Sequence, residues 1–176
     1  MTEVAIRAIR GDEAHARCSL LADILVACVD GGASVSFMAP LSHDTAESFW
    51  HNVADFVTVG HRVLLVAEDS QTQEILGTVQ LFLKQPENQP HRADLAKMLV
   101  VPSARRRGIG ARLMQAAEDA GRAVGKTLLV LDTATGGDAE RLYERAGWIR
   151  AGVIPNYALW PDGRPCSTSI FYKSLL

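Results

Sequence analysis

The 176-residue sequence predicts a mixed α/β fold, in which one largely antiparallel sheet has helices packed against it. Three observations support this prediction. Segments with the two-residue alternation of strands are interspersed with segments that have the spacing of amphipathic helices. Two neighbouring strand segments are joined by a short polar turn, which is typical of an antiparallel hairpin. An apolar run that follows a helix, Thr127–Asp132, is typical of a buried parallel strand.

The N-terminal part of the chain predicts one strand and one long helix. Apolar and polar residues alternate over Val4–Ile9, and Gly11-Asp12 ends this strand. A helical pattern then runs from about Glu13 to Val29. The apolar residues of this pattern that should face the core are Leu20, Leu21, Ile24 and Leu25.

A second helix is predicted before the middle of the chain. Either Ser42 or Asp44 can cap its start, because short polar side chains accept hydrogen bonds from the first-turn N–H groups. The helix continues to about Val59, and Gly60 ends it. Its apolar face would consist of Phe49, Trp50, Val53 and Phe56.

The rest of the chain supplies the remaining strands and two more helices. Arg62–Glu68 and Ile75–Lys84 flank a polar turn and should form the first hairpin. A closing hairpin is expected around the Pro161-Asp162-Gly163 turn. The other predicted segments are the strands Arg92–Val101, Thr127–Asp132, Trp148–Ile154 and Ser167–Tyr172 and the helices Arg112–Val124 and about Asp138–Ala146. Seven strands and four helices result, and we expect one domain over residues 1–176.

Composition excludes several classes of protein. A formal net charge of −2 gives no bias towards nucleic acid or an anionic membrane. The longest uncharged run, Gly31 to His43, has too many small and polar residues to span a bilayer, and the N-terminus has no apolar signal core. Three cysteines without a Cys-x-x-Cys pair argue against a disulfide framework, and the five histidines have no metal-ligand spacing. We therefore expect a cytoplasmic protein without a metal.

The segment from Val100 to Ala111 has the features of an anion-binding loop. A predicted strand ends at Pro102, the arginines Arg105–Arg107 follow, and Gly108 and Gly110 precede a helix. The first turn of a helix has N–H groups without intrahelical partners and the positive end of the helix dipole, so an anionic group can bind there. Glycine permits close approach of that group, and it also permits a positive φ.

Two common phosphate-binding motifs do not fit this loop. A dinucleotide-binding fingerprint requires a third glycine where Leu113 stands. A P-loop requires Gly-x-x-x-x-Gly-Lys-Thr, but residue 120 is alanine, and the Gly125-Lys126-Thr127 segment leads from a helix into a strand rather than the reverse.

The pattern Arg105-x-x-Gly108-x-Gly110-Ala111 resembles the pyrophosphate-binding motif of the GCN5-related N-acetyltransferase (GNAT) family. Two further segments resemble this family, Val100-Val101-Pro102 before the motif and Tyr143-x-x-x-Gly147-Trp148 after it. The element order agrees along nearly the whole chain. The resemblance implies the GNAT fold, with a sheet splayed between its fourth and fifth strands, and it implies acetyl-CoA as the co-substrate.

The resemblance also implies which residues bind acetyl-CoA. The pantetheine arm would pair with main-chain groups of Met98, Leu99 and Val100 in the fourth strand. The pyrophosphate would lie against the N-terminus of the following helix, at Arg106, Arg107, Gly108, Ile109, Gly110 and Ala111. The asparagine that is often found seven residues before the family's tyrosine is Gly136 here, which leaves the pantetheine contacts of that helix open.

Acetyl transfer needs a proton for the leaving thiolate and a neutral amine, and two residues are candidates for these tasks. Tyr143 is protonated at neutral pH and could donate to the sulfur, or it could be a packing residue between helix and sheet. Asp132, at the carboxyl end of the fifth strand, could orient the amine or act as a base through water, or it could cap a turn.

The substrate wall is predicted from residues outside the cofactor motif. Phe37 and Met38 either line a pocket or anchor their loop to the core, and Tyr157 belongs to the closing hairpin. Lys97 interrupts an apolar strand, so it could hold a substrate carboxylate or extend to the sheet edge. Strand alternation predicts that Lys97 does not pair with Asp94.

Within the family, further stretches, such as Gly31–Val35 and Pro161–Arg164, are similar to those of the tabtoxin-resistance acetyltransferases. That similarity implies a small-molecule amine as acceptor, with tabtoxinine-β-lactam as the specific example. The alternatives are an acetyltransferase for protein N-termini or lysines and a CoA-binding module without activity. Both a monomer and a homodimer are compatible with the sequence.

Overall fold

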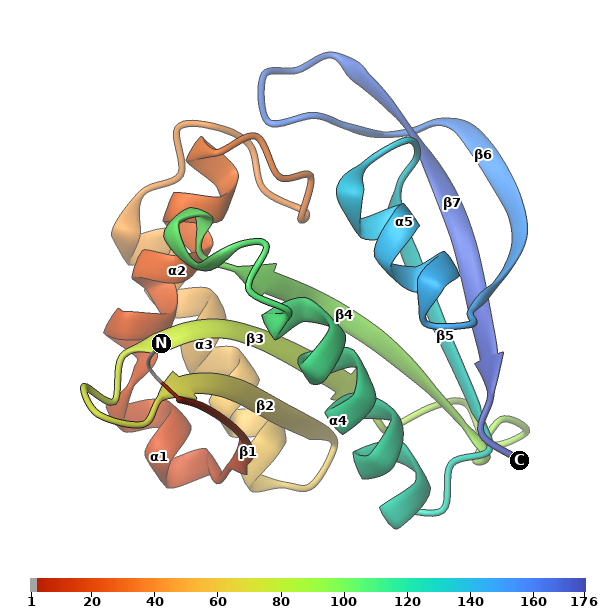
Figure 1. Ribbon diagram of the computed structural model, residues 1–176, viewed down its shortest axis with the longest axis horizontal. Helices are drawn as coiled ribbons and strands as arrows, with labels where there is room; N and C mark the ends of the chain where they lie inside the picture. Colours follow the sequence, from red (N-terminus) through yellow and green to blue (C-terminus); the bar gives the residue numbers. More distant parts are fainter. Residues whose placement is uncertain (1–2) are drawn as a thin grey trace.

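The computed structural model describes residues 3–176, which form a single seven-stranded sheet with helices on both faces (Figure 1). The strand order is β1-β2-β3-β4-β5-β7-β6. The strands are β1 (Val4–Ile9), β2 (Arg62–Asp69), β3 (Ile75–Phe82), β4 (Arg92–Val100), β5 (Leu128–Ala134), β6 (Ile149–Leu159) and β7 (Pro165–Ser174). The helices are α1 (Gly11–Ala16), α2 (Cys18–Asp30), α3 (His43–Thr58), the short 3₁₀ helix η1 (Pro102–Ala104), α4 (Ile109–Ala123) and α5 (Asp138–Arg145).

Neighbouring strands are antiparallel except at the centre of the sheet, where β4 and β5 run parallel. Both predicted hairpins are present, β2–β3 and β6–β7. The predicted fold class is therefore confirmed, including the parallel strand that the apolar run at Thr127–Asp132 indicated.

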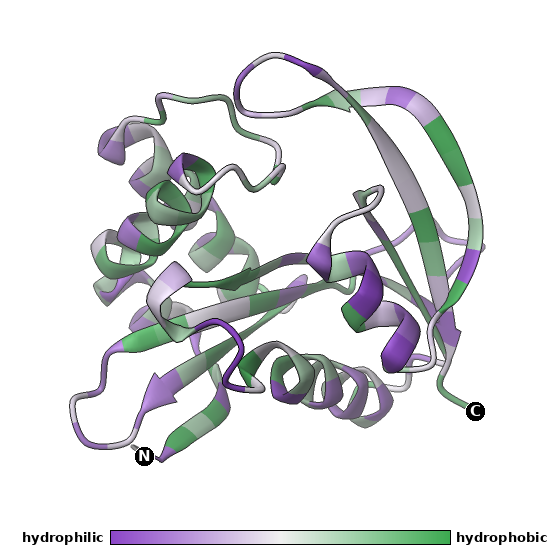
Figure 2. Cartoon of the chain, turned by 45° about the horizontal axis from the view of Figure 1, so that its top comes forward, coloured by the Kyte–Doolittle hydropathy of each residue, from purple (hydrophilic) through white to green (hydrophobic). Residues whose placement is uncertain are grey.

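Two apolar cores hold the helices against the sheet. One lies between the sheet and α4, and it includes Leu113, Met114 and Phe171. The other lies between the sheet and α1–α3, and it includes Leu25, Trp50 and Leu64. The middle strands are mostly hydrophobic because both of their faces are covered, whereas α5 is hydrophilic along much of its length (Figure 2).

The long helix predicted from Glu13 to Val29 is two helices, because the chain breaks at Arg17, where φ is −111°. The Arg17 guanidinium forms an ion pair with Glu68 of β2, so the residue at the break is also in contact with the sheet. The buried stripe of α2 includes Leu21, Ile24 and Leu25, as predicted, but Leu20 lies off the stripe and is exposed. Phe56 of α3 was also predicted to be buried, and it is exposed beneath the Arg62 guanidinium, whose carbon is 4.7 Å from the ring centroid.

Other boundaries differ from the predictions at turns. Helix α4 begins at Ile109 instead of Arg112, because Gly108 provides a left-handed N-cap with φ of 76°. Strand β6 continues past Ile154 to Leu159 through a register irregularity, so the closing hairpin is longer than its alternating segment indicated. Within residues 3–176, no helix is both long enough and apolar enough to cross a membrane.

Candidate active site

The sheet opens between its two parallel strands. Strands β4 and β5 pair over Arg92–Asp94 and Leu128–Val130, and beyond these residues they diverge. Strand β4 remains paired with β3 as far as Val100, so its opposite edge faces the gap. Main-chain groups at such an edge can form hydrogen bonds with an extended ligand, as the next strand would. The predicted splay is therefore present.

A β-bulge at Lys97 changes the direction of side chains along β4. Lys97 has φ of 51°, and two residues of β4, Lys97 and Met98, oppose the single residue Val79 of β3 at this point. The Thr78 hydroxyl donates to the Lys97 carbonyl at 3.1 Å and holds the bulge. Because the extra residue shifts the alternation, Leu95 packs in the α4 core and Leu99 in the opposite core. Simple strand parity was therefore the wrong basis for placing Lys97, although Lys97 and Asp94 indeed form no pair.

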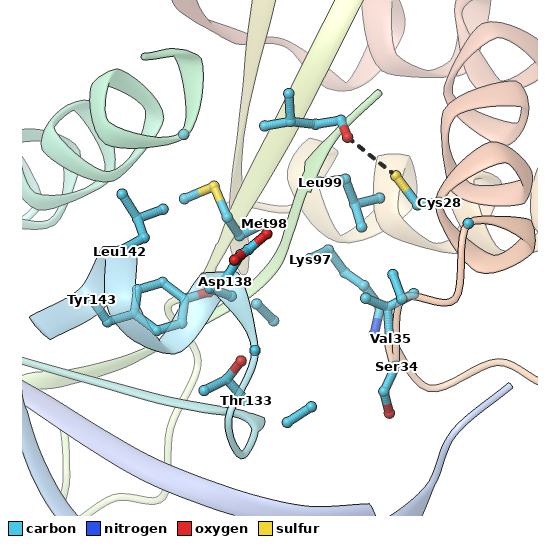
Figure 3. Close-up of a pocket in the computed structure, with 18 of the residues that line it drawn as sticks. Cys28, Ser34, Val35, Lys97, Met98, Leu99, Thr133, Asp138, Leu142 and Tyr143 are labelled. Atoms are coloured by element: carbon cyan, nitrogen blue, oxygen red, sulfur yellow. Dashed lines mark hydrogen bonds between the residues drawn. The ribbon is translucent and has the colours of Figure 1, made fainter. Parts of the chain in front are cut away.

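A cavity of about 1010 Å³ occupies the opening between β4 and β5. Its walls come from the loop between α2 and α3, from β4, from the η1–α4 loop, and from β5, α5 and β6. Figure 3 shows Tyr143 and Leu142 on one side of the cavity, with Ser34 and Val35 across from them. Segments far apart in the sequence therefore build one concave site at the carboxyl end of the parallel strands.

The arginine and glycine loop lies at one end of this cavity. The Arg105 guanidinium donates to the Val100 carbonyl at 3.2 Å, which fastens the loop to the end of β4. Arg106 and Gly108 both have positive φ, at 60° and 76°, and this conformation turns the chain into α4. The first turn of α4 then presents free N–H groups to the cavity at Ile109, Gly110 and Ala111. These groups fit an anionic pyrophosphate.

The two glycines of the motif have different physical roles. At Gly108, a Cβ would meet no atom within 4 Å, so glycine is required there for the positive φ. At Gly110, φ is ordinary, but a Cβ would lie 3.1 Å from Cδ2 of Leu142. Gly110 thus allows α4 to approach α5 closely beside the cavity.

The residues predicted to contact acetyl-CoA lie along one continuous wall of the cavity, with the exception of Arg107. The cavity is lined by Met98, Leu99, Val100, Arg106, Gly108, Ile109, Gly110 and Ala111. Arg107 does not belong to this lining, whereas Arg105, which the prediction left out of the pyrophosphate contacts, does. Arg106, between these two arginines, has a left-handed backbone conformation that the sequence did not indicate.

The substitution Gly110→Trp is expected to abolish acetyl-CoA binding measured by isothermal titration calorimetry. The indole would collide with Leu142 and occupy the space in front of the first-turn N–H groups. Gly152→Trp is the matched control, because a Cβ at Gly152 in β6 would meet nothing within 4 Å. Circular dichroism should show both variants folded, and unchanged affinity in Gly110→Trp would contradict the assignment of this loop.

Tyr143 extends from α5 into the cavity (Figure 3). Its ring is buried and packs against Trp148 and Phe171, with ring centroids 6.2 and 6.0 Å apart. Burial, and then the negative charge of Asp132, raise the pKa of the Tyr143 phenol well above its usual value. The phenol therefore stays protonated at neutral pH and can serve as a proton donor. Tyr143 was predicted to be either a proton donor or a packing residue. Its ring packs between helix and sheet, and its side chain also lines the cavity.

The loop between β5 and α5 is held by a buried carboxylate. Glu140 accepts a hydrogen bond from the Gly136 N–H at 2.6 Å and another from the Ser169 hydroxyl at 2.6 Å. The Ser169 bond and the Gly136 N–H, together with the nearby Arg150, hold the pKa of Glu140 below its usual range despite burial. Gly136 has φ of 83°, so glycine provides a turn at the position where the family often has asparagine.

Lys97 and Asp132 supply opposite charges to the cavity. The Lys97 ammonium donates to the Ser36 hydroxyl at 2.8 Å, and it lies 5.8 and 5.6 Å from the ring centroids of Phe37 and Phe49. Burial lowers the pKa of Lys97, and the negative charge of Asp132 partly offsets that effect. Asp132 itself is exposed at the carboxyl end of β5.

The loop between α2 and α3 and the β6–β7 hairpin are bonded to each other above the cavity. The Ser34 hydroxyl donates to the Leu159 carbonyl at 3.2 Å, and the Ala39 N–H donates to the Pro161 carbonyl at 3.0 Å. The predicted substrate residues Phe37, Met38 and Tyr157 line the cavity beneath this junction. Phe37 also packs edge-on against Phe49 of α3, so it anchors its loop as well.

The sequence did not single out several lining residues as contributors to the site. These are Cys28 in α2 and Thr133 and Asp138 around the β5–α5 turn, whereas Ser34 and Val35 belong to the Gly32–Met38 segment that was expected to form the substrate wall. Thr133 directly follows Asp132, so its position near the end of β5 could have indicated that it lines the site. Cys28 looks like any buried helical residue, and only the sheet topology brings it to the end of β4, where its thiol lies 3.6 Å from the Val100 carbonyl.

Comparison with known proteins gives a consistent result. The model of the acetyltransferase (GNAT) family matches residues 33–148. An uncharacterized N-acetyltransferase from the hisH–hisA intergenic region of Azospirillum brasilense is 31% identical over 137 residues, which cover 75% of this chain and 76% of that protein.

Solved structures share the fold. An N-acetyltransferase from Staphylococcus aureus Mu50 has a TM-score of 0.79 at 18% identity, and the match covers 99% of this chain and 100% of that one. The yncA protein of Salmonella typhimurium, solved with its cofactor acetyl-CoA, has a TM-score of 0.79 at 17% identity over 99% of this chain and 95% of that one.

The chain therefore belongs to the GNAT family of acetyltransferases. It is an acetyl-CoA-dependent N-acetyltransferase, with acetyl-CoA as its co-substrate. The predictions of the family, the enzyme class and the co-substrate are thus confirmed.

Proposed function

We propose that this enzyme transfers the acetyl group to the amine of a small amino-acid-like molecule. The observation that carries the proposal is the pair of opposite charges, Lys97 and Asp132, in one cavity. A zwitterionic amino acid has a carboxylate that Lys97 can hold and an ammonium group that Asp132 can hold. The sequence similarity to tabtoxin-resistance acetyltransferases makes tabtoxinine-β-lactam the first toxin to test, with resistance as the corresponding role.

The connection between the α2–α3 loop and the β6–β7 hairpin supports a small substrate over a protein. The two hydrogen bonds that join the α2–α3 loop to the β6–β7 hairpin lie above the acceptor residues. A protein N-terminus or a lysine on a folded domain needs an open groove for the flanking chain.

The reaction uses the proposed residues in a simple order. Asp132 orients the ammonium group, which loses a proton to solvent through water before the amine nitrogen attacks the thioester carbonyl. The attacking nitrogen then carries one excess proton, which it also loses to solvent through water as the tetrahedral intermediate collapses. As the carbon–sulfur bond breaks, Tyr143 donates its phenolic proton to the thiolate, and solvent reprotonates the phenolate. The products are the N-acetyl compound and CoA with a free thiol.

The same proposal places the reaction in the cytoplasm. All three cysteines are buried and unpaired, which suits a reducing compartment.

A thiol-release assay with a matched substrate panel tests the acceptor class. The panel contains amino acids, their decarboxylated amines, tabtoxinine-β-lactam, aminoglycosides and short peptides, each with saturating acetyl-CoA. We expect turnover with amino acids and much less with amines that lack the carboxylate. Turnover limited to peptides would overturn the proposal in favour of a protein acetyltransferase. Acetyl-CoA binding with no turnover on any acceptor would favour a CoA-binding module.

Lys97→Gln is expected to lower kcat/KM for carboxylate-bearing acceptors by about tenfold to a hundredfold, chiefly through KM. A hydrogen bond to a charged group is worth about 1.5–3 kcal/mol, and glutamine removes the charge while it keeps a polar side chain that is one bond shorter. The decarboxylated amine should lose little, because it makes no ion pair with Lys97. Lys84→Gln serves as the control, because Lys84 is exposed outside the cavity lining. Equal losses on both acceptors would remove Lys97 from the carboxylate role.

A further inference from the structure

A second cluster of chemically active side chains lies apart from the acetyl-CoA cavity. His15 is in the last turn of α1, Cys18 begins α2, and His51 is in the middle of α3. None of the three lines the cavity. The break at Arg17 between α1 and α2 turns His15 and Cys18 towards the same face of α3.

The ring nitrogens of the two histidines converge. Nδ1 of His15 lies 3.2 Å from Nδ1 of His51, and the ring centroids are 5.5 Å apart. With the Cys18 sulfur included, all three potential ligand atoms lie within 4.8 Å of one another. Both imidazoles are partly exposed, so an ion can reach them, while the thiol forms the buried side of the cluster.

We propose that His15, Cys18 and His51 form a binding site for a borderline-soft divalent metal ion, Zn²⁺ in the first instance, whose fourth coordination position is open to water. The ligand set of two imidazoles and one thiolate is the type that Zn²⁺ prefers. Acetyl transfer needs no metal, so this site is independent of the proposed reaction. Its physical effect is to fasten the junction of α1 and α2 to α3.

The distance between the two nitrogens suits a tetrahedral ion. Bonds of about 2.0–2.1 Å from zinc to each imidazole place the two nitrogens about 3.3 Å apart at a tetrahedral angle. The observed 3.2 Å separation therefore needs almost no adjustment. The thiol must move closer and leave its hydrogen bond with the Ala14 carbonyl, which is now 3.2 Å long.

The outer nitrogens of the two rings face carboxylates. Nε2 of His15 lies 3.0 Å from Asp55, and Nε2 of His51 lies 4.0 Å from Glu47. Metal-bound histidines commonly donate their second N–H to a carboxylate, as the His15–Asp55 distance allows, whereas the His51–Glu47 contact is electrostatic at its present length. If both outer nitrogens carry protons for these carboxylates, both inner nitrogens present lone pairs to each other. A cation between them turns that repulsion into two coordinate bonds.

Deprotonation of the Cys18 thiol is the main free-energy cost of binding the metal ion. Burial, and then the charges of Glu47 and Asp55, raise the pKa of Cys18 to about 11, so an incoming metal must displace the thiol proton. The same two carboxylates favour a cation at this place. The cluster contains no Cys-x-x-Cys or His-x-x-x-His spacing, because its ligands come from two separate parts of the chain that only packing brings together.

Calorimetric titration of Zn²⁺ into the chelator-treated full chain tests the proposal, with a phosphine reductant present. We expect one ion per chain for the wild type and a rise in melting temperature that a chelator reverses. His51→Gln should abolish both effects, and Asp55→Asn should weaken affinity by about 10- to 100-fold. His43→Gln is the matched control, because His43 lies on the same helix, is similarly exposed and also contacts Glu47. Equal losses in His51→Gln and His43→Gln would overturn the site.

Cobalt substitution tests the sulfur ligand separately. Co²⁺ bound at the cluster should show a thiolate-to-metal charge-transfer band, which Cys18→Ser removes and Cys166→Ser keeps. Cys166 is also buried, but it lies on β7, away from the cluster. Absence of binding by the wild type, or bound Co²⁺ without the charge-transfer band, would overturn the proposal. The first result would leave the two histidines as a hydrogen-bonded contact between helices.

Discussion

Tyr143→Phe is expected to lower kcat by about 10²- to 10⁴-fold while acetyl-CoA affinity stays unchanged. The substitution removes only the phenolic oxygen, so the packing of the ring against Trp148 and Phe171 is retained. Without that oxygen, the thiolate of CoA must leave unprotonated or take its proton from water. Steady-state kinetics with saturating acetyl-CoA, together with calorimetric titration of acetyl-CoA, measures both quantities.

Tyr172→Phe is the matched control for this experiment, because Tyr172 lies on β7 outside the cavity and is 37% exposed. Its rate should equal that of the wild type. If Tyr143→Phe also kept the wild-type rate, Tyr143 would be a packing residue and another group would protonate the thiolate. If it lost acetyl-CoA affinity instead, the hydroxyl would serve binding rather than proton transfer.

Glu118→Ala is expected to lower the free energy of unfolding by about 3–5 kcal/mol, because it breaks a buried ionic network. The Glu118 carboxylate on α4 accepts two hydrogen bonds of 2.8 Å from the Lys173 ammonium and one of 3.1 Å from the Trp148 indole. Its side chain is only 3% exposed. Alanine would leave the Lys173 charge with the Ala146 carbonyl, 2.7 Å away, as its remaining partner. Urea denaturation would measure the loss.

Two comparisons make this result specific. Asp119→Ala, on the next residue of α4, removes an exposed ion pair with Arg122 and should cost about 0–1 kcal/mol. The double variant Glu118→Leu with Lys173→Met should recover part of the loss, because it leaves no unpaired buried charge. A loss in Glu118→Ala no larger than that in Asp119→Ala would show that the network does not stabilise the fold.

Much of the fold was predictable because local chemistry decides it. The alternation at Val4–Ile9, the apolar run at Thr127–Asp132 and the turn at Pro161–Gly163 each indicated an element that the structure contains. The prediction of one long N-terminal helix was wrong, because hydrophobic periodicity does not show where the backbone leaves helical geometry. The long N-terminal helix breaks at Arg17, whose guanidinium pairs with Glu68, a residue 51 positions away.

The cofactor side of the candidate site was more predictable from the sequence than the acceptor side. The cofactor loop was recognisable because adjacent residues build it, namely three arginines and two glycines before a helix. The acceptor side was only partly predictable. Ser34 and Leu159 meet across 125 residues, and the sequence has no pattern that pairs them.

By itself, the sequence indicated the fold class through periodicity, and the resemblance of its contiguous motifs to those of the GNAT family indicated the family and the co-substrate. Both periodicity and contiguous motifs are local properties of the chain. Only the tertiary structure decided which arginines reach the cavity, how the bulge at Lys97 shifts β4, and that His15, Cys18 and His51 converge. The physical reason is that these features depend on the packing of segments far apart in the chain, and the spacing of residues along one segment contains no information about it.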